Sequence, residues 1–142
     1  MSFLYVNGQD IGRLVLGLCA VSDTGGWSFS HTPEVISVSP EAYLSAIDAY
    51  IVAQGTALAS LQGFVLVAGP GSATALRAAH ALVNALSFAR SIPVYSIEKE
   101  ATLADAGVFT QSEVRSTRVA VPVYAHEARI TQGTKDALRR NI

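Results

Sequence analysis

The chain has 142 residues, half of them hydrophobic, with a formal net charge of −1 at pH 7. This length suits one sizeable core, and the near-neutral charge gives no basic surface for direct binding to nucleic acid. Only 15% of the residues are charged and the mean hydropathy is +0.35, so part of the apolar surface is expected to meet a partner. The single cysteine, Cys19, excludes an intrachain disulfide and a cysteine-rich metal site.

The first third of the chain is typical of strands. Apolar runs at residues 3–6, 13–21 and 27–30 are separated by two turn signals. Asn7-Gly8 predicts a two-residue hairpin turn, and residues 23–26 predict a second turn. We therefore expect a three-stranded antiparallel meander.

The apolar run at residues 11–21 is too short to span a membrane. Asp10 and Arg13 flank or interrupt it, and no basic region precedes it as in a signal peptide. The sequence predicts a cytoplasmic protein without membrane contact.

The hydrophobic period then changes to that of a helix. Ser39-Pro40-Glu41 is a helix start, and Gly55 is the expected C-terminal cap. A strand at residues 64–68, a helix at 72–90 and a strand at 92–97 follow. This order predicts an α/β fold in which parallel strands and helices follow the meander.

The last third gives weaker signals. Residues 101–106 favour a short helix, residues 118–124 a strand, and residues 135–140 a brief terminal helix. The polar stretch 107–117 is expected to be a linker. The predicted organisation is a main lobe at 1–106, this linker, and a remnant of a second lobe or a C-terminal extension at 118–142.

The most informative motif follows the strand at residues 64–68 and opens the next helix. A strand, a glycine-rich corner and a helix N-terminus present backbone N–H groups that suit an anion or a close protein contact. No Gly-Lys-Ser/Thr closes the loop, so it is not a phosphate-binding P-loop. The candidate loop residues are Gly69, Pro70, Gly71, Ser72, Thr74 and Arg77.

Residues 69–77 resemble the Gly-Pro-Gly-Ser-Phe-Thr-Gly-Leu-Arg signature of the TsaB (YeaZ) family, with seven of nine positions identical. The strand before the motif, residues 91–97, and Glu127-Ala128-Arg129 are similar to further family segments in the same order. The resemblance implies a ribonuclease-H-like lobe of the actin-like ATPase superfamily, shortened to about the first of the family's two lobes. Val6-Asn7-Gly8 stands where the family has Asp-Thr-Ser, which argues against ATP turnover.

The resemblance implies an accessory subunit without catalytic residues or cofactor. Its expected partner is a TsaD-type catalytic subunit, with tRNA contacted only indirectly during threonylcarbamoyladenosine synthesis, or a second copy of itself. We expect the helices at residues 41–54 and 73–90 to form the interface. The candidate interface residues are Leu44, Ile47, Ile51, Leu76, Ala79, His80, Val83 and Asn84.

Two other hypotheses come from the residues. The first is a self-associating homodimer that holds a nucleotide or other anion at the 69–72 corner. The second is a dimeric aspartic protease built on Asp23-Thr24-Gly25, although two Ala-rich helices disfavour it and the triplet lies where a hairpin needs turn residues. The three histidines lack metal-ligand spacing, so no metal site is expected.

Overall fold

The computed structural model describes residues 2–23, 26–97, 108–109, 114–117 and 120–123. Its strands form one mixed sheet in the order β7-β3-β2-β1-β5-β6-β8, with β4 paired to β2 beside this path. The strands are β1 (Ser2–Asn7), β2 (Leu14–Val21), β3 (Trp27–Phe29), β4 (Glu34–Ile36), β5 (Leu61–Val67), β6 (Val94–Ile97), β7 (Val108–Phe109) and β8 (Val114–Thr117). The helices are α1 (Tyr43–Ala53) and α2 (Ala73–Arg90), with short 3-10 turns η1 (Pro40–Ala42) and η2 (Leu58–Ser60).

The predicted meander is confirmed, because β1, β2 and β3 pair antiparallel in succession. The prediction of a two-residue turn at Asn7-Gly8 is wrong. Asn7 still pairs with Val15, and the chain reverses further on, where the Arg13 N–H donates to the Asp10 carbonyl at 3.3 Å and Gly12 has a φ of 77°. Gly8 lies instead where α2 packs: a Cβ there would come within 2.8 Å of the Ala79 Cβ.

Strand β4 was not expected from the sequence. It pairs with Leu14–Leu16 of β2, whereas β3 pairs with Cys19–Val21, so the two short strands share one edge of β2. Three residues between Pro33 and Ser37 are too few to show a period-2 pattern, which is why sequence periodicity missed this strand.

The helix boundaries follow the predicted caps. Ser39, in extended backbone, precedes η1 and α1, but its hydroxyl makes no capping hydrogen bond and α1 begins only at Tyr43. Gly55 follows α1 with a φ of 70°. The Ser72 hydroxyl accepts a hydrogen bond from the Ala75 N–H at 3.4 Å at the start of α2. Strands β1, β5 and β6 are parallel, as the α/β prediction requires.

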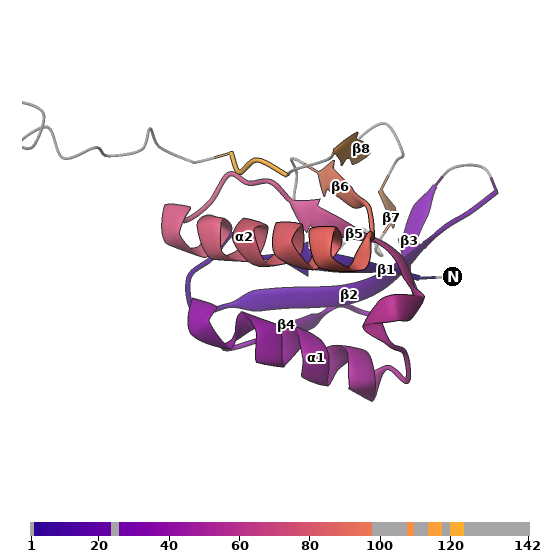
Figure 1. The fold of residues 1–142 in the computed structure, drawn as a ribbon, viewed down its shortest axis with the longest axis horizontal. Helices are drawn as coiled ribbons and strands as arrows, with labels where there is room; N and C mark the ends of the chain where they lie inside the picture. Colours follow the sequence, from indigo (N-terminus) through magenta and orange to yellow (C-terminus); the bar gives the residue numbers. More distant parts are fainter. Residues whose placement is uncertain (1, 24–25, 98–107, 110–113, 118–119, 124–142) are drawn as a thin grey trace, which may run out of the picture.

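Both helices lie on the same face of the sheet (Figure 1). Alternating residues of β1, β2 and β5 form the main core with them, among them Leu4, Leu16 and Phe64. The opposite face carries a second, aromatic cluster in which the Phe3 and Trp27 rings pack edge to face, with centroids 4.7 Å apart. Among the described helices, none combines the length and apolar character that crossing a membrane requires.

The C-terminal third corrects two expectations. The stretch 107–117, expected to be a linker, contains β7, which pairs with β3, and β8, which pairs with β6. Residues 120–123 of the expected strand 118–124 are not in a strand. The helices expected at 101–106 and 135–140 lie outside the described residues, and the division into lobes stays a prediction.

Candidate functional site

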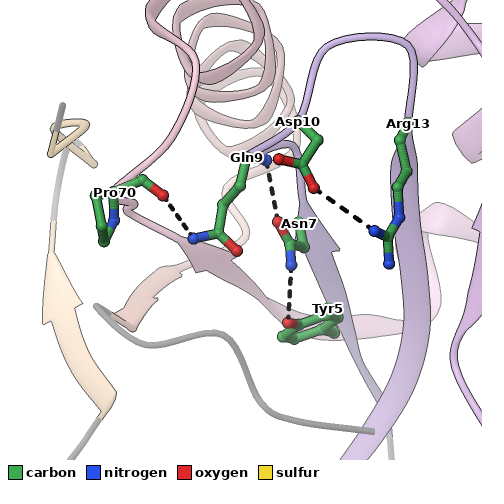
Figure 2. Close-up of polar contacts among 6 residues, drawn as sticks. All are labelled: Tyr5, Asn7, Gln9, Asp10, Arg13 and Pro70. Carbon is green, nitrogen blue, oxygen red and sulfur yellow. Dashed lines mark hydrogen bonds and ion pairs between the residues drawn. The ribbon is translucent and has the colours of Figure 1, made fainter. Parts of the chain in front are cut away.

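The glycine-rich motif lies against the loop that follows β1 (Figure 2). The Gln9 side-chain amide donates to the Pro70 carbonyl at 2.7 Å, and the Ser72 N–H donates to the Gln9 carbonyl at 2.8 Å. Because β1 and β5 are parallel neighbours, both loops leave the same edge of the sheet. We call this contact between residues 7–9 and 69–72 the loop junction.

The two glycines of the motif allow close approach by other segments of the same chain. Gly69 has a φ of 131°, and a Cβ there would lie 1.9 Å from the Val123 carbonyl oxygen. A Cβ on Gly71 would lie 2.5 Å from the Gln9 carbonyl oxygen. Both positions therefore need glycine for packing within the chain.

Asn7 extends the loop junction into the sheet. Its side chain is buried, its Oδ1 accepts from the Gln9 N–H at 3.0 Å, and its Nδ2 donates to the Tyr5 hydroxyl at 3.5 Å (Figure 2). The nearby carboxylate, Asp10, is exposed and forms an ion pair with Arg13 at 3.6 Å. The buried groups are thus neutral amides and a phenol, which do not serve as a carboxylate general acid or base.

The hydrogen bonds of the loop junction bear on anion binding. The Ser72 N–H is taken by Gln9 and the Ala75 N–H by the Ser72 hydroxyl, while Pro70 has no N–H. Thr74 and Arg77 are exposed one turn further on. The residues predicted as an anion loop therefore use much of their donor capacity within the chain.

Most of the predicted interface residues face the core instead of a surface. The reason is that the apolar stripe of each helix is the face that packs on the sheet, so the same periodicity identified the core side. A partner therefore cannot contact these side chains without unfolding the helices. The buried residues are Ile47, Ile51, Leu76, Ala79, His80 and Val83.

The two remaining predicted interface residues differ from each other. Leu44 is 53% exposed on the outer side of α1. Asn84 is half-buried and makes two hydrogen bonds to one residue: its Nδ2 donates to the Ala120 carbonyl at 3.0 Å, and its Oδ1 accepts from the Ala120 N–H at 2.9 Å. Asn84 thus fixes residues 120–123 to α2.

His80 lies one turn before Asn84 and is buried. Its Nδ1 is 2.8 Å from the Leu76 carbonyl oxygen, and its Nε2 has no hydrogen-bond partner within the part of the chain that the structure describes. Burial lowers the pKa of His80, and the hydrogen bond to Leu76 opposes this in part. The imidazole is therefore held neutral inside the fold.

Besides Leu44, the helices expose large apolar residues that the sequence analysis did not single out. Phe88 of α2 is 90% exposed, and Val52 of α1 is 67% exposed. The signal available in the sequence was Phe88 itself, an aromatic residue outside the core stripe of α2. We call these exposed positions the two-helix surface: Leu44, Val52, Ala81, Ala85 and Phe88.

Asp23 of the protease hypothesis is exposed in the turn between β2 and β3. The Ser22 N–H donates to the Gly26 carbonyl at 2.8 Å, and the Gly26 N–H donates to the Ser22 hydroxyl at 3.1 Å. The predicted turn is confirmed, whereas Thr24 and Gly25 lie outside the described residues. Across the parts that the structure describes, no three His, Cys, Asp or Glu side chains gather as metal ligands do.

Comparisons with known proteins agree with the fold. The chain is similar to the structure of YeaZ from Pseudomonas aeruginosa, with 22% identity and a TM-score of 0.57 over 87% of this chain and 74% of that one. A second structure, described as an uncharacterized protein with similarity to peptidase YeaZ from Pseudomonas aeruginosa, has 22% identity and the same TM-score over 89% of this chain and 72% of that one. These matches show that the chain has the fold of the YeaZ structures, as the TsaB (YeaZ) resemblance predicts.

A search of curated protein sequences gave no significant match. A family model does match, over residues 33–136, which is more than half of the chain, and its description is TsaD: tRNA N6-adenosine threonylcarbamoyltransferase. The match includes α1, the glycine-rich motif and α2. The chain therefore belongs to the TsaD family.

Proposed function

We propose that this chain is a non-catalytic, TsaB-type subunit that pairs with a TsaD-type catalytic subunit and supports threonylcarbamoyladenosine modification of tRNA. The observation that carries the proposal is the two-helix surface, where Leu44, Val52 and Phe88 expose large apolar side chains on two helices that cover the same face of the sheet, as protein-contact sites do. Phe88, the most exposed large apolar residue described, is the expected anchor.

The chemistry of the loop junction supports an accessory role. Asn7 occupies the end of β1 with a neutral amide that is already bonded to Gln9 and Tyr5. An active phosphate site at this edge would need a carboxylate to hold a cation, and Asn7 does not supply one. The subunit would act by burying the two-helix surface and so favouring the active arrangement of its partner.

The test is to mix the chain with the TsaD-type subunit of the same organism and measure mass by light scattering after size exclusion. We expect a one-to-one complex, and we expect threonylcarbamoyladenosine formation on tRNA to depend on the chain. A homodimer that ignores the TsaD-type subunit would overturn the proposal in favour of self-association.

Phe88→Ala tests the surface itself. We expect the dissociation constant for the TsaD-type subunit to rise about 30-fold, the effect of losing about 2 kcal/mol at an aromatic anchor. Ile11→Ala is the matched control, because Ile11 is also exposed but lies in the loop between β1 and β2. Equal affinities for the two variants would remove the two-helix surface from the interface.

A further inference from the structure

A hollow of about 450 Å³ lies between strand β4 and helix α1 (Figure 1 shows the two elements side by side). From β4 and the segment after it, Glu34, Ile36 and Val38 contribute; from α1, Ala46, Ala49, Tyr50 and Ala53 do so.

The hollow exists because the side of α1 that faces β4 carries small side chains. Ala46, Ala49 and Ala53 recur at helical spacing along this side, and Ser45 lies beside them. Larger residues at these positions would close the gap between α1 and β4. The sequence therefore leaves a space here that the residues lining it do not fill.

Glu34 places an exposed carboxylate on strand β4, beside the hollow. It pairs with Leu16, and the helix-facing positions around it include Leu14 and Leu16, which are fully buried. Among the residues that line the hollow, Glu34 is the one with a charged side chain. Burial is the main cause that raises the pKa of Tyr50, and the Glu34 carboxylate raises it further.

We propose that this hollow receives an arginine or lysine side chain of the protein that docks on the two-helix surface. The apolar walls suit the methylene stem of such a side chain, and Glu34 suits its cationic head. On α1 the hollow borders one member of the two-helix surface, because Val52 lies one turn after Ala49 and both residues are exposed. The inference rests on the proposed function, since the TsaD-type subunit is the partner that brings this side chain.

The test measures the affinity of the TsaD-type subunit by calorimetry for four proteins. Wild type is compared with Glu34→Gln, which removes the charge but keeps the shape, and with Ala49→Leu, which fills the hollow without changing charge. Asp23→Asn is the control, because it removes an exposed carboxylate from the distant turn between β2 and β3. Thermal unfolding of each variant accompanies the titrations.

We expect Glu34→Gln to weaken binding about 10-fold and to reduce the salt dependence of the affinity, because one charge-assisted contact is lost. Ala49→Leu should weaken binding by a similar factor at any salt concentration, and Asp23→Asn should leave it unchanged. If wild type binds and both Glu34→Gln and Ala49→Leu bind as tightly as wild type, the inference about the hollow is overturned and the proposed function stands. If wild type does not bind the TsaD-type subunit at all, the proposed function fails and the inference fails with it.

Discussion

The loop junction and the two-helix surface use their residues in opposite ways. At the loop junction, the most recognisable motif of the sequence is engaged within the chain: Pro70 and Ser72 bond to Gln9, and Gly69 contacts Val123. The two-helix surface has no motif, yet Phe88 is almost fully exposed there. A motif that identifies a family can thus serve the fold, while the proposed contact surface carries no sequence motif.

The comparison predicts that two alanines on the same helix respond differently to the same substitution. Ala79→Glu should destabilise the protein by about 4 kcal/mol or more, because Ala79 is buried next to Gly8 and the carboxylate would have no partner there. Ala85→Glu, on the exposed side, should change the free energy of unfolding by less than about 0.5 kcal/mol but weaken binding to the TsaD-type subunit. Urea unfolding and calorimetry separate the two effects; similar stabilities would contradict the assigned orientation of α2.

Gly69→Ala tests the role of the loop junction in the fold. We expect a loss of about 3 kcal/mol in the free energy of unfolding, because the new Cβ would overlap the Val123 carbonyl in addition to the cost of positive φ. Gly55→Ala is the matched control: Gly55 also has positive φ, but nothing lies within 4 Å of its Cβ position. That control should cost about 1 kcal/mol. If both variants lose the same amount, close packing at Gly69 contributes nothing.

Asn84→Ala tests whether a residue predicted for the interface instead holds the chain's own segment. Loss of both hydrogen bonds to Ala120 should cost about 2 kcal/mol and speed hydrogen exchange at the Ala120 amide. Asn84→Asp retains the acceptor for the Ala120 N–H and should protect that amide better than alanine does. Unchanged exchange in Asn84→Ala would show that the contact is not needed to hold residues 120–123.

Sequence reasoning predicted the meander, both helices, their caps and the parallel strands, because each has a local signal such as Ser72 before α2 or Gly55 after α1. It did not distinguish the side of a helix that packs in the core from a side that meets a partner. An apolar stripe such as Leu76 and Val83 recurs at the same helical spacing in both situations. It also missed β4 and the pairing of β8 with β6, which depend on neighbours distant in sequence. The glycine-rich motif was found in the sequence, but its partner Gln9 is 61 residues from Pro70 and carries no recognisable signal.

The smallest expected effect is the pH dependence that His80 gives to stability. Its folded pKa lies below the ordinary value of 6.5, so the unfolded chain binds more protons than the folded one between those two values. Stability from this group is therefore complete above pH 6.5 and falls as the pH decreases toward the folded pKa, by at most about 1.4 kcal/mol per pH unit. Urea unfolding of the wild type from about pH 5 to about pH 7.5, the range in which histidine titrates, should show this slope.

His80→Leu should remove that slope, whereas His31→Gln, at an exposed position, should retain it. If the pH dependence of stability survives in His80→Leu, another group causes it. Burial of His80 then has no measurable cost. Loss of the slope would place His80 with Ala79 and Asn84 among the residues that α2 uses inside the chain. The part of α2 available to a partner would then be the side that carries Ala81, Ala85 and Phe88. A buried, neutral imidazole on the other side is not accessible to another protein.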